Sequence, residues 1–129
     1  APLRVLVAED NSINQKLIRK ILEKAGYQVS IAADGAAAVE QHSSASFDLI
    51  LMDCQMPKLS GYEATAKIRE REKQTQQHIP IIALTAHAMG GDREKCIESG
   101  MDDYLSKPIK TSALFEIIQK LTDTPTDQR

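Results

Sequence analysis

Residues 47–53 read Phe-Asp-Leu-Ile-Leu-Met-Asp, an apolar run that Asp48 interrupts and Asp53 closes. A run this short and this rich in leucine and isoleucine fits a strand buried on both faces better than a helix. Four other short apolar runs are spaced along the chain, and a segment with helical periodicity follows each of them. We therefore expect the run from Phe47 to Met52 to form the central strand of a sheet.

The remaining elements follow the same alternation. The other strands are expected at Leu3 to Ala8, Tyr27 to Ala32, Ile81 to Leu84 and Tyr104 to Ser106. The first helix is expected to end at Gly26 and to carry an apolar stripe of Ile13, Leu17, Ile18, Ile21 and Leu22. The other helices are expected over Ala36 to Gln41, Tyr62 to Glu72, Asp92 to Ser99 and Thr111 to Leu121. The charged run 69–73 is expected at a solvated helix end, and 73–78 as a loop. Because parallel neighbours need crossover connections, this order predicts an α/β fold, a doubly wound five-stranded parallel sheet with five helices on its two faces.

Length and composition limit the function. A chain of 129 residues, 42% hydrophobic and 26% charged, is expected to form one domain over residues 1–122, with a polar tail or linker at 123–129. We expect it to be a piece of a longer protein or one without its initiator methionine. The net charge of −2 offers no general attraction for nucleic acid, and no apolar run is long enough to span a membrane. Two cysteines, Cys54 and Cys96, are too few for a disulfide framework and suit the cytoplasm.

Polar residues stand directly after the expected strands. Glu9 and Asp10 follow the first strand, Asp53 ends the third, Thr85 ends the fourth and Lys107 follows the fifth. Open parallel sheets bind their ligands beyond the carboxyl ends of the strands, so these residues are expected to share one crevice. Three carboxylates in one crevice repel each other unless a cation joins them, and an all-oxygen set suits Mg²⁺.

This set of residues predicts phosphoryl chemistry. With a metal ion in place, Asp53 can act as a nucleophile toward phosphorus and become an aspartyl phosphate. Lys107 would offset charge on the phosphoryl oxygens, and Thr85 would donate a hydrogen bond to one of them. The alternative to a metal site is that Glu9 and Asp10 only cap the N-terminus of the following helix.

Four segments in order resemble the receiver domain of two-component response regulators, over essentially the whole chain before the tail. They are Val7-Ala8-Glu9-Asp10-Asn11, Leu51-Met52-Asp53-Cys54-Gln55-Met56-Pro57 with Gly61, Ile82-Ala83-Leu84-Thr85-Ala86, and Tyr104-Leu105-Ser106-Lys107-Pro108. The resemblance implies a flavodoxin-like sheet of order 2-1-3-4-5, with Asp53 as phosphoacceptor. It also implies a Mg²⁺ site made by Glu9, Asp10, Asp53 and the Gln55 carbonyl, and a cis peptide before Pro108.

The same resemblance implies roles for four further residues. Thr85 and Tyr104 would form a coupled switch that changes the surface made by the fourth helix, fifth strand and fifth helix. Gln55 and His87 would tune the lifetime of the phosphoryl group. Cys54, next to the acceptor, is expected to be a small buried hydrophobe rather than a reactive thiol.

A narrower resemblance concerns the exact residues in and near these segments. Asp53-Cys54-Gln55-Met56-Pro57, Leu84-Thr85-Ala86-His87-Ala88-Met89 and Gly100-Met101-Asp102-Asp103-Tyr104 look like receivers fused to hybrid sensor histidine kinases. The implied partners are a histidine kinase domain and a histidine-phosphotransfer domain, with no contact of this domain with nucleic acid or membrane, although the parent could be membrane-anchored. The isolated domain would catalyse only its own phosphorylation and dephosphorylation.

Three other readings compete with this one, and the residues disfavour the last two. The domain could belong to a stand-alone or DNA-binding response regulator instead of a hybrid kinase. A phosphatase of the haloacid-dehalogenase type also uses a strand-end Asp with Mg²⁺, but it carries a second Asp where this chain has Gln55. A flavin- or nucleotide-binding module would present a glycine- or hydroxyl-rich phosphate cradle after the first strand, where Glu9 and Asp10 would repel phosphate.

Overall fold

The structure is a computed structural model that describes residues 3–54, 56, 58–85, 91–107 and 109–122. Strands and helices alternate through these residues as β1 (Arg4–Ala8), α1 (Ser12–Lys24), β2 (Gln28–Ala32), α2 (Gly35–Ser44), β3 (Leu49–Asp53), α3 (Gly61–Thr75), β4 (Ile81–Thr85), α4 (Gly91–Ser99), β5 (Asp103–Ser106) and α5 (Thr111–Thr122). The strands form one parallel sheet in the order β2-β1-β3-β4-β5. This confirms the predicted doubly wound α/β fold with β3 at its centre. Within the described residues, every helix falls short of the length or apolar character that a bilayer crossing requires.

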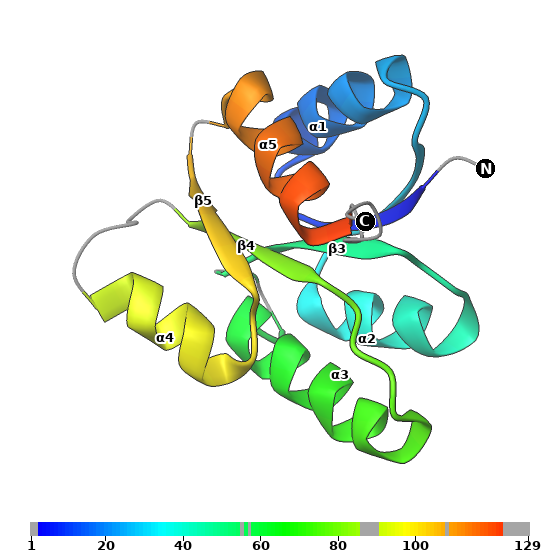
Figure 1. Cartoon of the computed structure of the whole chain (residues 1–129), viewed down its shortest axis with the longest axis vertical. Helices are drawn as coiled ribbons and strands as arrows, with labels where there is room; N and C mark the ends of the chain where they lie inside the picture. Colours follow the sequence, from blue (N-terminus) through cyan, green and yellow to red (C-terminus); the bar gives the residue numbers. More distant parts are fainter. Residues whose placement is uncertain (1–2, 55, 57, 86–90, 108, 123–129) are drawn as a thin grey trace, which may run out of the picture.

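The sheet separates two hydrophobic cores. Helices α1 and α5 cover one face, and α2, α3 and α4 cover the other (Figure 1). Successive side chains of a strand point to opposite faces, so Val5 and Val7 join the core under α1 and α5 while Leu6 and Ala8 join the other. Strands β3 and β4 are buried along their whole length, which fixes their carboxyl ends firmly in place.

Helix α3 is longer than the sequence pattern predicts. Its N-terminus has a capping box, in which the Ser60 hydroxyl accepts a hydrogen bond from the Glu63 amide at 3.2 Å and the Glu63 carboxylate accepts one from the Ser60 amide at 3.1 Å. The helix continues past the predicted end at Glu72 until Gln76 adopts a left-handed conformation with φ of 58°. The first three residues of the expected loop, 73–75, are therefore helical.

The apolar stripe predicted for α1 is only partly buried. Ile18 and Leu22 are buried against the sheet, as expected. In contrast, 74% of Ile13 and 47% of Leu17 are exposed, because the sheet covers only the narrower strip around Ile18 and Leu22. These two side chains leave an apolar surface next to the carboxyl ends of the strands.

The charged run 69–73 is not simply a solvated helix end. The Arg69 and Glu72 side chains are 15% and 6% exposed, and they form an ion pair with Arg69 Nη1 at 2.6 Å from Glu72 Oε1. The expectation of a solvated run holds for Glu70 and Lys73, whose side chains are about three-quarters exposed. The prediction was wrong for the other pair because their partners come from segments that are distant in the sequence.

Candidate functional site

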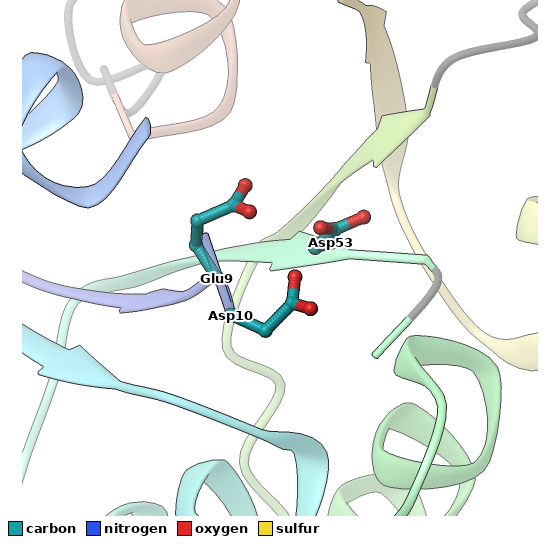
Figure 2. Close-up of side chains that lie close together, drawn as sticks. All are labelled: Glu9, Asp10 and Asp53. Carbon is teal, nitrogen blue, oxygen red and sulfur yellow. The ribbon is translucent and has the colours of Figure 1, made fainter. Parts of the chain in front are cut away.

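Three acids meet at the carboxyl edge of the sheet. Strands β1 and β3 are hydrogen-bonded neighbours, so the residues that follow β1 lie beside the last residue of β3. Carboxylate oxygens of Glu9, Asp10 and Asp53 all lie within 4.8 Å of one another (Figure 2). Glu9 and Asp53 are buried, and Asp10 is exposed at the mouth of the site. The structure thus brings together the three acids that the sequence placed in one crevice.

Lys107, which follows the edge strand β5, pairs with two of these acids. Its Nζ lies 2.9 Å from Asp53 Oδ2 and 3.3 Å from Glu9 Oε1, and its backbone N–H donates to the Thr85 carbonyl at 2.8 Å. Burial by itself would lower the pKa of Lys107, but the hydrogen bond and charge of Asp53, together with the charge of Glu9, raise that pKa above its usual value. The ammonium group is therefore held in its charged form.

Glu9 is a buried carboxylate with one poorly satisfied oxygen. Its Oε2 accepts a hydrogen bond from the Asn11 backbone N–H at 3.1 Å. Its Oε1 forms an ion pair with Lys107 at 3.3 Å but has no well-aligned hydrogen bond, and it is one of two such buried side-chain atoms among the described residues. Burial raises the pKa of Glu9, and the charge of Asp53 raises it further, whereas the Asn11 bond and Lys107 lower it. A cation placed between the acids would satisfy this oxygen.

Glu9 and Asp10 are not the cap of α1. Asn11 is the N-cap residue, and its side-chain oxygen accepts the backbone N–H groups of Ile13 at 2.9 Å and Asn14 at 3.0 Å. The Gln15 side chain donates to the Glu9 carbonyl at 2.6 Å and holds the chain at the strand end. The capping-acid reading therefore fails, since another residue supplies the cap.

Gly61 allows the chain after β3 to pack closely against Asp53. Its amide donates to the Cys54 carbonyl at 3.0 Å. A Cβ atom at this position would collide with the backbone carbonyl of Asp53, so only glycine permits this close approach. The N-terminus of α3 is thereby packed directly behind Asp53.

Thr85 completes a small cleft. It ends β4, is 4% exposed and lies beside Asp53, because β3 and β4 are hydrogen-bonded neighbours. The cleft has a volume of about 250 Å³ and is lined by Glu9, Asp10, Asn11, Asn14, Asp53, Cys54, Thr85 and Lys107. All five residues predicted from the strand ends thus line one cleft.

Tyr104, the predicted partner of Thr85 in a switch, lies in β5. It pairs in register with Ala83, two residues before Thr85 on the neighbouring strand, and packs against the core under α3 and α4. It is half-buried. This places it between the cleft and the α4 side of the sheet. The predicted coupling of the two side chains remains a prediction.

Three other predicted features lie outside the described residues. These are the Gln55 carbonyl as a metal ligand, His87 with Gln55 as tuners of phosphoryl lifetime, and the cis peptide before Pro108. One cleft residue was missed by the sequence reasoning. Asn14 stands four residues after Asp10, and its Nδ2 lies 3.5 Å from Glu9 Oε2. The signal that could have identified it is its place in the first turn of the helix that follows the two acids.

The chain matches a known family over nearly its whole length. The profile described as "Response regulator receiver domain" matches residues 5–119. The hybrid signal transduction histidine kinase I of Dictyostelium discoideum is 55% identical over 122 residues, which cover 91% of this chain and 7% of that protein. The sensor protein GacS of Pseudomonas syringae pv. syringae is 44% identical over 120 residues, covering 92% of this chain and 13% of that protein. The chain therefore spans only a small part of these relatives.

Solved structures show the same fold. The receiver domain of the sensor histidine kinase PA1611 of Pseudomonas aeruginosa, described with a magnesium ion coordinated in its active site cleft, has 45% identity and a TM-score of 0.87. That match covers 96% of this chain and 100% of the other. A Saccharomyces cerevisiae complex of the phosphotransfer protein Ypd1 with the receiver domain of the response regulator Ssk1 matches with 36% identity and a TM-score of 0.88, covering 94% and 89% of the two chains.

Proposed function

Because this chain belongs to the response regulator receiver family, we propose that it accepts a phosphoryl group on Asp53 in a phosphorelay. The observation that carries the proposal is the charge arrangement at the carboxyl edge of the sheet. Glu9, Asp10 and Asp53 bring three carboxylates into one cleft, and Lys107 is the described cation among them. The cleft therefore retains excess negative charge until a cation binds.

The residues of the cleft fit a magnesium ion. Glu9, Asp10 and Asp53 would hold it, with the Gln55 carbonyl that the family resemblance implies. All the donor atoms are oxygens, which is the set that Mg²⁺ prefers. Oε1 of buried Glu9, which has no well-aligned hydrogen bond, is available as a ligand atom. When bound, the ion supplies neutralising charge for an incoming phosphoryl group.

The chain's own residues then account for the transfer. A carboxylate oxygen of Asp53 attacks phosphorus, an O–P bond forms, and the P–N bond of a phosphohistidine breaks with its electron pair left on the imidazole nitrogen. Lys107 stabilises negative charge on the phosphoryl oxygens, and the Thr85 hydroxyl donates a hydrogen bond to one of them. Movement of Thr85 toward the phosphoryl group would be followed by Tyr104, which alters the α4 and β5 surface.

The proposed partners are a histidine kinase domain that donates the phosphoryl group and a histidine-phosphotransfer domain that accepts it next. In this proposal the chain is the receiver domain in the cytoplasmic part of a hybrid histidine kinase. Exposed Ile13 and Leu17 supply an apolar docking surface beside the cleft. An adjoining apolar hollow of about 310 Å³ is lined by Leu17, Ile18 and Ile109 and also reaches Asn14 and Lys107. A helix of a phosphotransfer domain would cover this surface and present its histidine to Asp53, and the existence of the Ypd1 complex of a 36% identical receiver supports this arrangement.

The test is phosphorylation by a small donor. We expect acetyl phosphate with Mg²⁺ to add the mass of one phosphoryl group to the wild-type domain, and Asp53→Asn to reduce this to background. Asp48→Asn is the matched control, because Asp48 is an exposed acid that accepts the Arg4 amide at the other end of the sheet. Chelation of Mg²⁺ should abolish labelling of the wild type. Labelling of Asp53→Asn at the wild-type rate would refute the assignment.

A further inference from the structure

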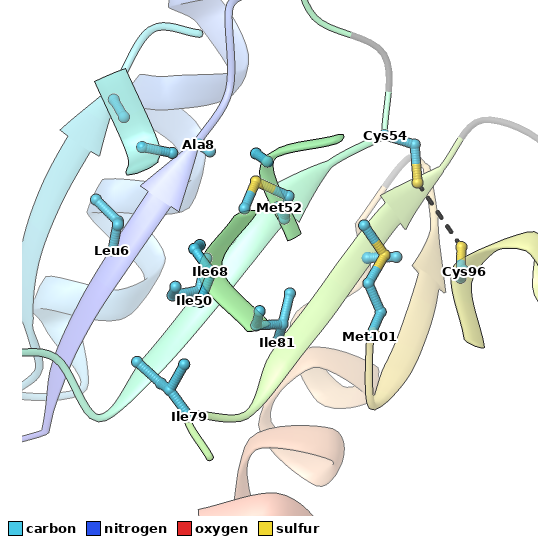
Figure 3. Close-up of a cluster of buried hydrophobic side chains, with 14 residues drawn as sticks. Leu6, Ala8, Ile50, Met52, Cys54, Ile68, Ile79, Ile81, Cys96 and Met101 are labelled. Carbon is cyan, nitrogen blue, oxygen red and sulfur yellow. Dashed lines mark hydrogen bonds between the residues drawn. The ribbon is translucent and has the colours of Figure 1, made fainter. Parts of the chain in front are cut away.

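Two buried thiols meet immediately behind the acceptor. Cys54 follows Asp53 in the chain, and Cys96 lies in the middle of α4. Their exposed fractions are 2% and 0%, and their Sγ atoms are 3.8 Å apart (Figure 3). Neither cysteine is part of a disulfide in this structure. No step of the proposed phosphoryl transfer uses either thiol.

The sulfur contact joins α4 to the end of β3. Of the α4 side chains whose burial is described, residues 94–99, Cys96 is buried, whereas Glu94, Lys95, Ile97 and Glu98 are exposed. At the end of the helix, the Met101 amide donates to the Cys96 carbonyl at 3.1 Å. Another contact between α4 and α3 is that of the Lys95 ammonium, 5.0 Å from the centre of the Tyr62 ring. A helix whose described side chains are mostly exposed is expected to open more easily than the rest of the fold.

We propose that Cys54 and Cys96 form an intrachain disulfide under oxidising conditions, and that this bond ties α4 to the end of β3. The oxidant class is a small uncharged peroxide. One thiolate attacks a peroxide oxygen, so that an S–O bond forms, the O–O bond breaks and the departing hydroxide becomes water. The second thiol then attacks that sulfur, the S–S bond forms and a second water leaves. The two cysteines lose two electrons and two protons, and hydrogen peroxide is reduced to two waters.

The burial that brings the two thiols together also makes them slow to react with an oxidant. Burial raises the pKa of Cys54 to about 12, and the neighbouring Cys96 and Asp53 contribute in the same direction, whereas a hydrogen bond from Tyr62 opposes the shift. Both sulfur atoms are buried, so a peroxide reaches them only when α4 opens.

The consequence for signalling rests on the proposed function. Because α4 lies on the surface that the Thr85 and Tyr104 movement would alter, a bond from Cys96 to the residue next to Asp53 would hold α4 in its resting place. The oxidised domain would then accept phosphate without rearranging that surface. Redox state would act on the output of the domain rather than on its chemistry.

The first experiment asks whether the bond forms in the folded domain. We expect hydrogen peroxide, or the thiol oxidant diamide, to yield a monomer lighter by two hydrogens that has no free thiols after denaturation in urea. Cys54→Ala and Cys96→Ala are the controls and cannot give this product. If the folded wild type keeps both thiols, or reacts only by cross-linking between chains, while the urea-unfolded chain forms the intrachain bond, the pair is only a packing contact and the proposal is wrong.

The second experiment asks what the bond does. Hydrogen exchange of the α4 amides should slow at least tenfold in the oxidised domain and return to its original rate after reduction with dithiothreitol. Acetyl phosphate should still label Asp53, and it should change α4 exchange in the reduced domain only. Unchanged hydrogen exchange of the α4 amides after disulfide formation would contradict the proposal that the bond holds α4 in place. Failure of the reduced wild type to take up phosphate would instead count against the proposed function and leave the disulfide result standing.

Discussion

Two clusters of charged side chains lie at opposite ends of the sheet, and they are built differently. At the amino ends of β4 and β5, Arg69 donates from Nε to the Gly100 carbonyl at 2.8 Å, from Nη1 to Glu72 and to the Ile79 carbonyl, and from Nη2 to Asp102 at 2.8 Å. The remaining carboxylate oxygens are also bonded: Glu72 Oε2 accepts the Ile79 amide, and Asp102 Oδ1 lies 2.7 Å from a histidine nitrogen, that of His78. At the carboxyl edge, Lys107 pairs with Glu9 and Asp53 but not with the third acid, Asp10, and Glu9 Oε1 has no well-aligned hydrogen bond.

The difference separates a structural cluster from a functional one. Buried charges stabilise a fold only when each has well-placed partners, as in the cluster of Arg69, Glu72 and Asp102. The carboxyl-edge cluster leaves negative charge and an unsatisfied oxygen in place, which costs stability until a cation binds. Neutralising a member of each cluster should therefore change stability in opposite directions.

The largest effect is expected at the structural cluster. Arg69→Met removes the cation from two acids, and we expect the free energy of unfolding to fall by about 3 kcal/mol, because Glu72 and Asp102 would lose their main partner. Urea denaturation measures this, and Mg²⁺ binding by calorimetry should be unchanged. The matched control is Lys73→Met on the same helix, whose pair with Glu70 is exposed. A similar loss in both variants would show that the cluster contributes nothing special.

The next effect has the opposite sign. Glu9→Gln should stabilise the metal-free domain at pH 8 by about 1 kcal/mol, because it removes a buried charge that the fold does not fully satisfy. Burial raises the pKa of Glu9 in the folded state. The contribution of Glu9 to the free energy of unfolding of the wild type should therefore be highest below the ordinary glutamate pKa and should fall as pH rises through the raised value. The variant should lack this fall and should also lose stabilisation by Mg²⁺.

Urea unfolding at pH 5 and pH 8, with chelator and with Mg²⁺, tests the Glu9 prediction. Equal Mg²⁺ stabilisation of variant and wild type would exclude Glu9 as a metal ligand. A variant that is less stable than wild type at both pH values without metal would show that the Glu9 carboxylate is well satisfied by Lys107 and the Asn11 amide.

The smallest effect is expected for an exposed ion pair in the loops that follow β2 and β3. Lys58 lies in the loop after β3, and its Nζ is 3.6 Å from Asp34 Oδ2, but 73% of its side chain is exposed. We expect Lys58→Met to change stability by less than about 0.5 kcal/mol, because exposed ion pairs are weak. Asp34→Ala should cost about 1 kcal/mol more, since Asp34 also caps α2 through the Ala37 amide at 2.8 Å. Urea denaturation of both variants measures the difference, and equal effects would contradict it.

The sequence by itself determined the fold and the membership of the cleft. Five apolar runs alternating with helical segments indicate a doubly wound parallel sheet, whose strand order came from the resemblance to receiver domains, and the residues after the strands of such a sheet lie at its carboxyl edge. For this reason Glu9, Asp10, Asp53, Thr85 and Lys107 could be grouped before any coordinates were known. Local signals also located the helix caps approximately, although the Ser60 capping box and the left-handed Gln76 set the true ends of α3.

Only the tertiary structure decided which side chains satisfy one another. Nothing local in the run 69–73 distinguishes Arg69, which bonds to residues up to 33 positions away, from the exposed Lys73. The contact of Cys54 with Cys96, the exposure of Ile13 and the unsatisfied oxygen of Glu9 depend likewise on packing between distant elements. Periodicity reports which face of an element is buried, whereas partners across the fold are set by register, rotamer and helix placement.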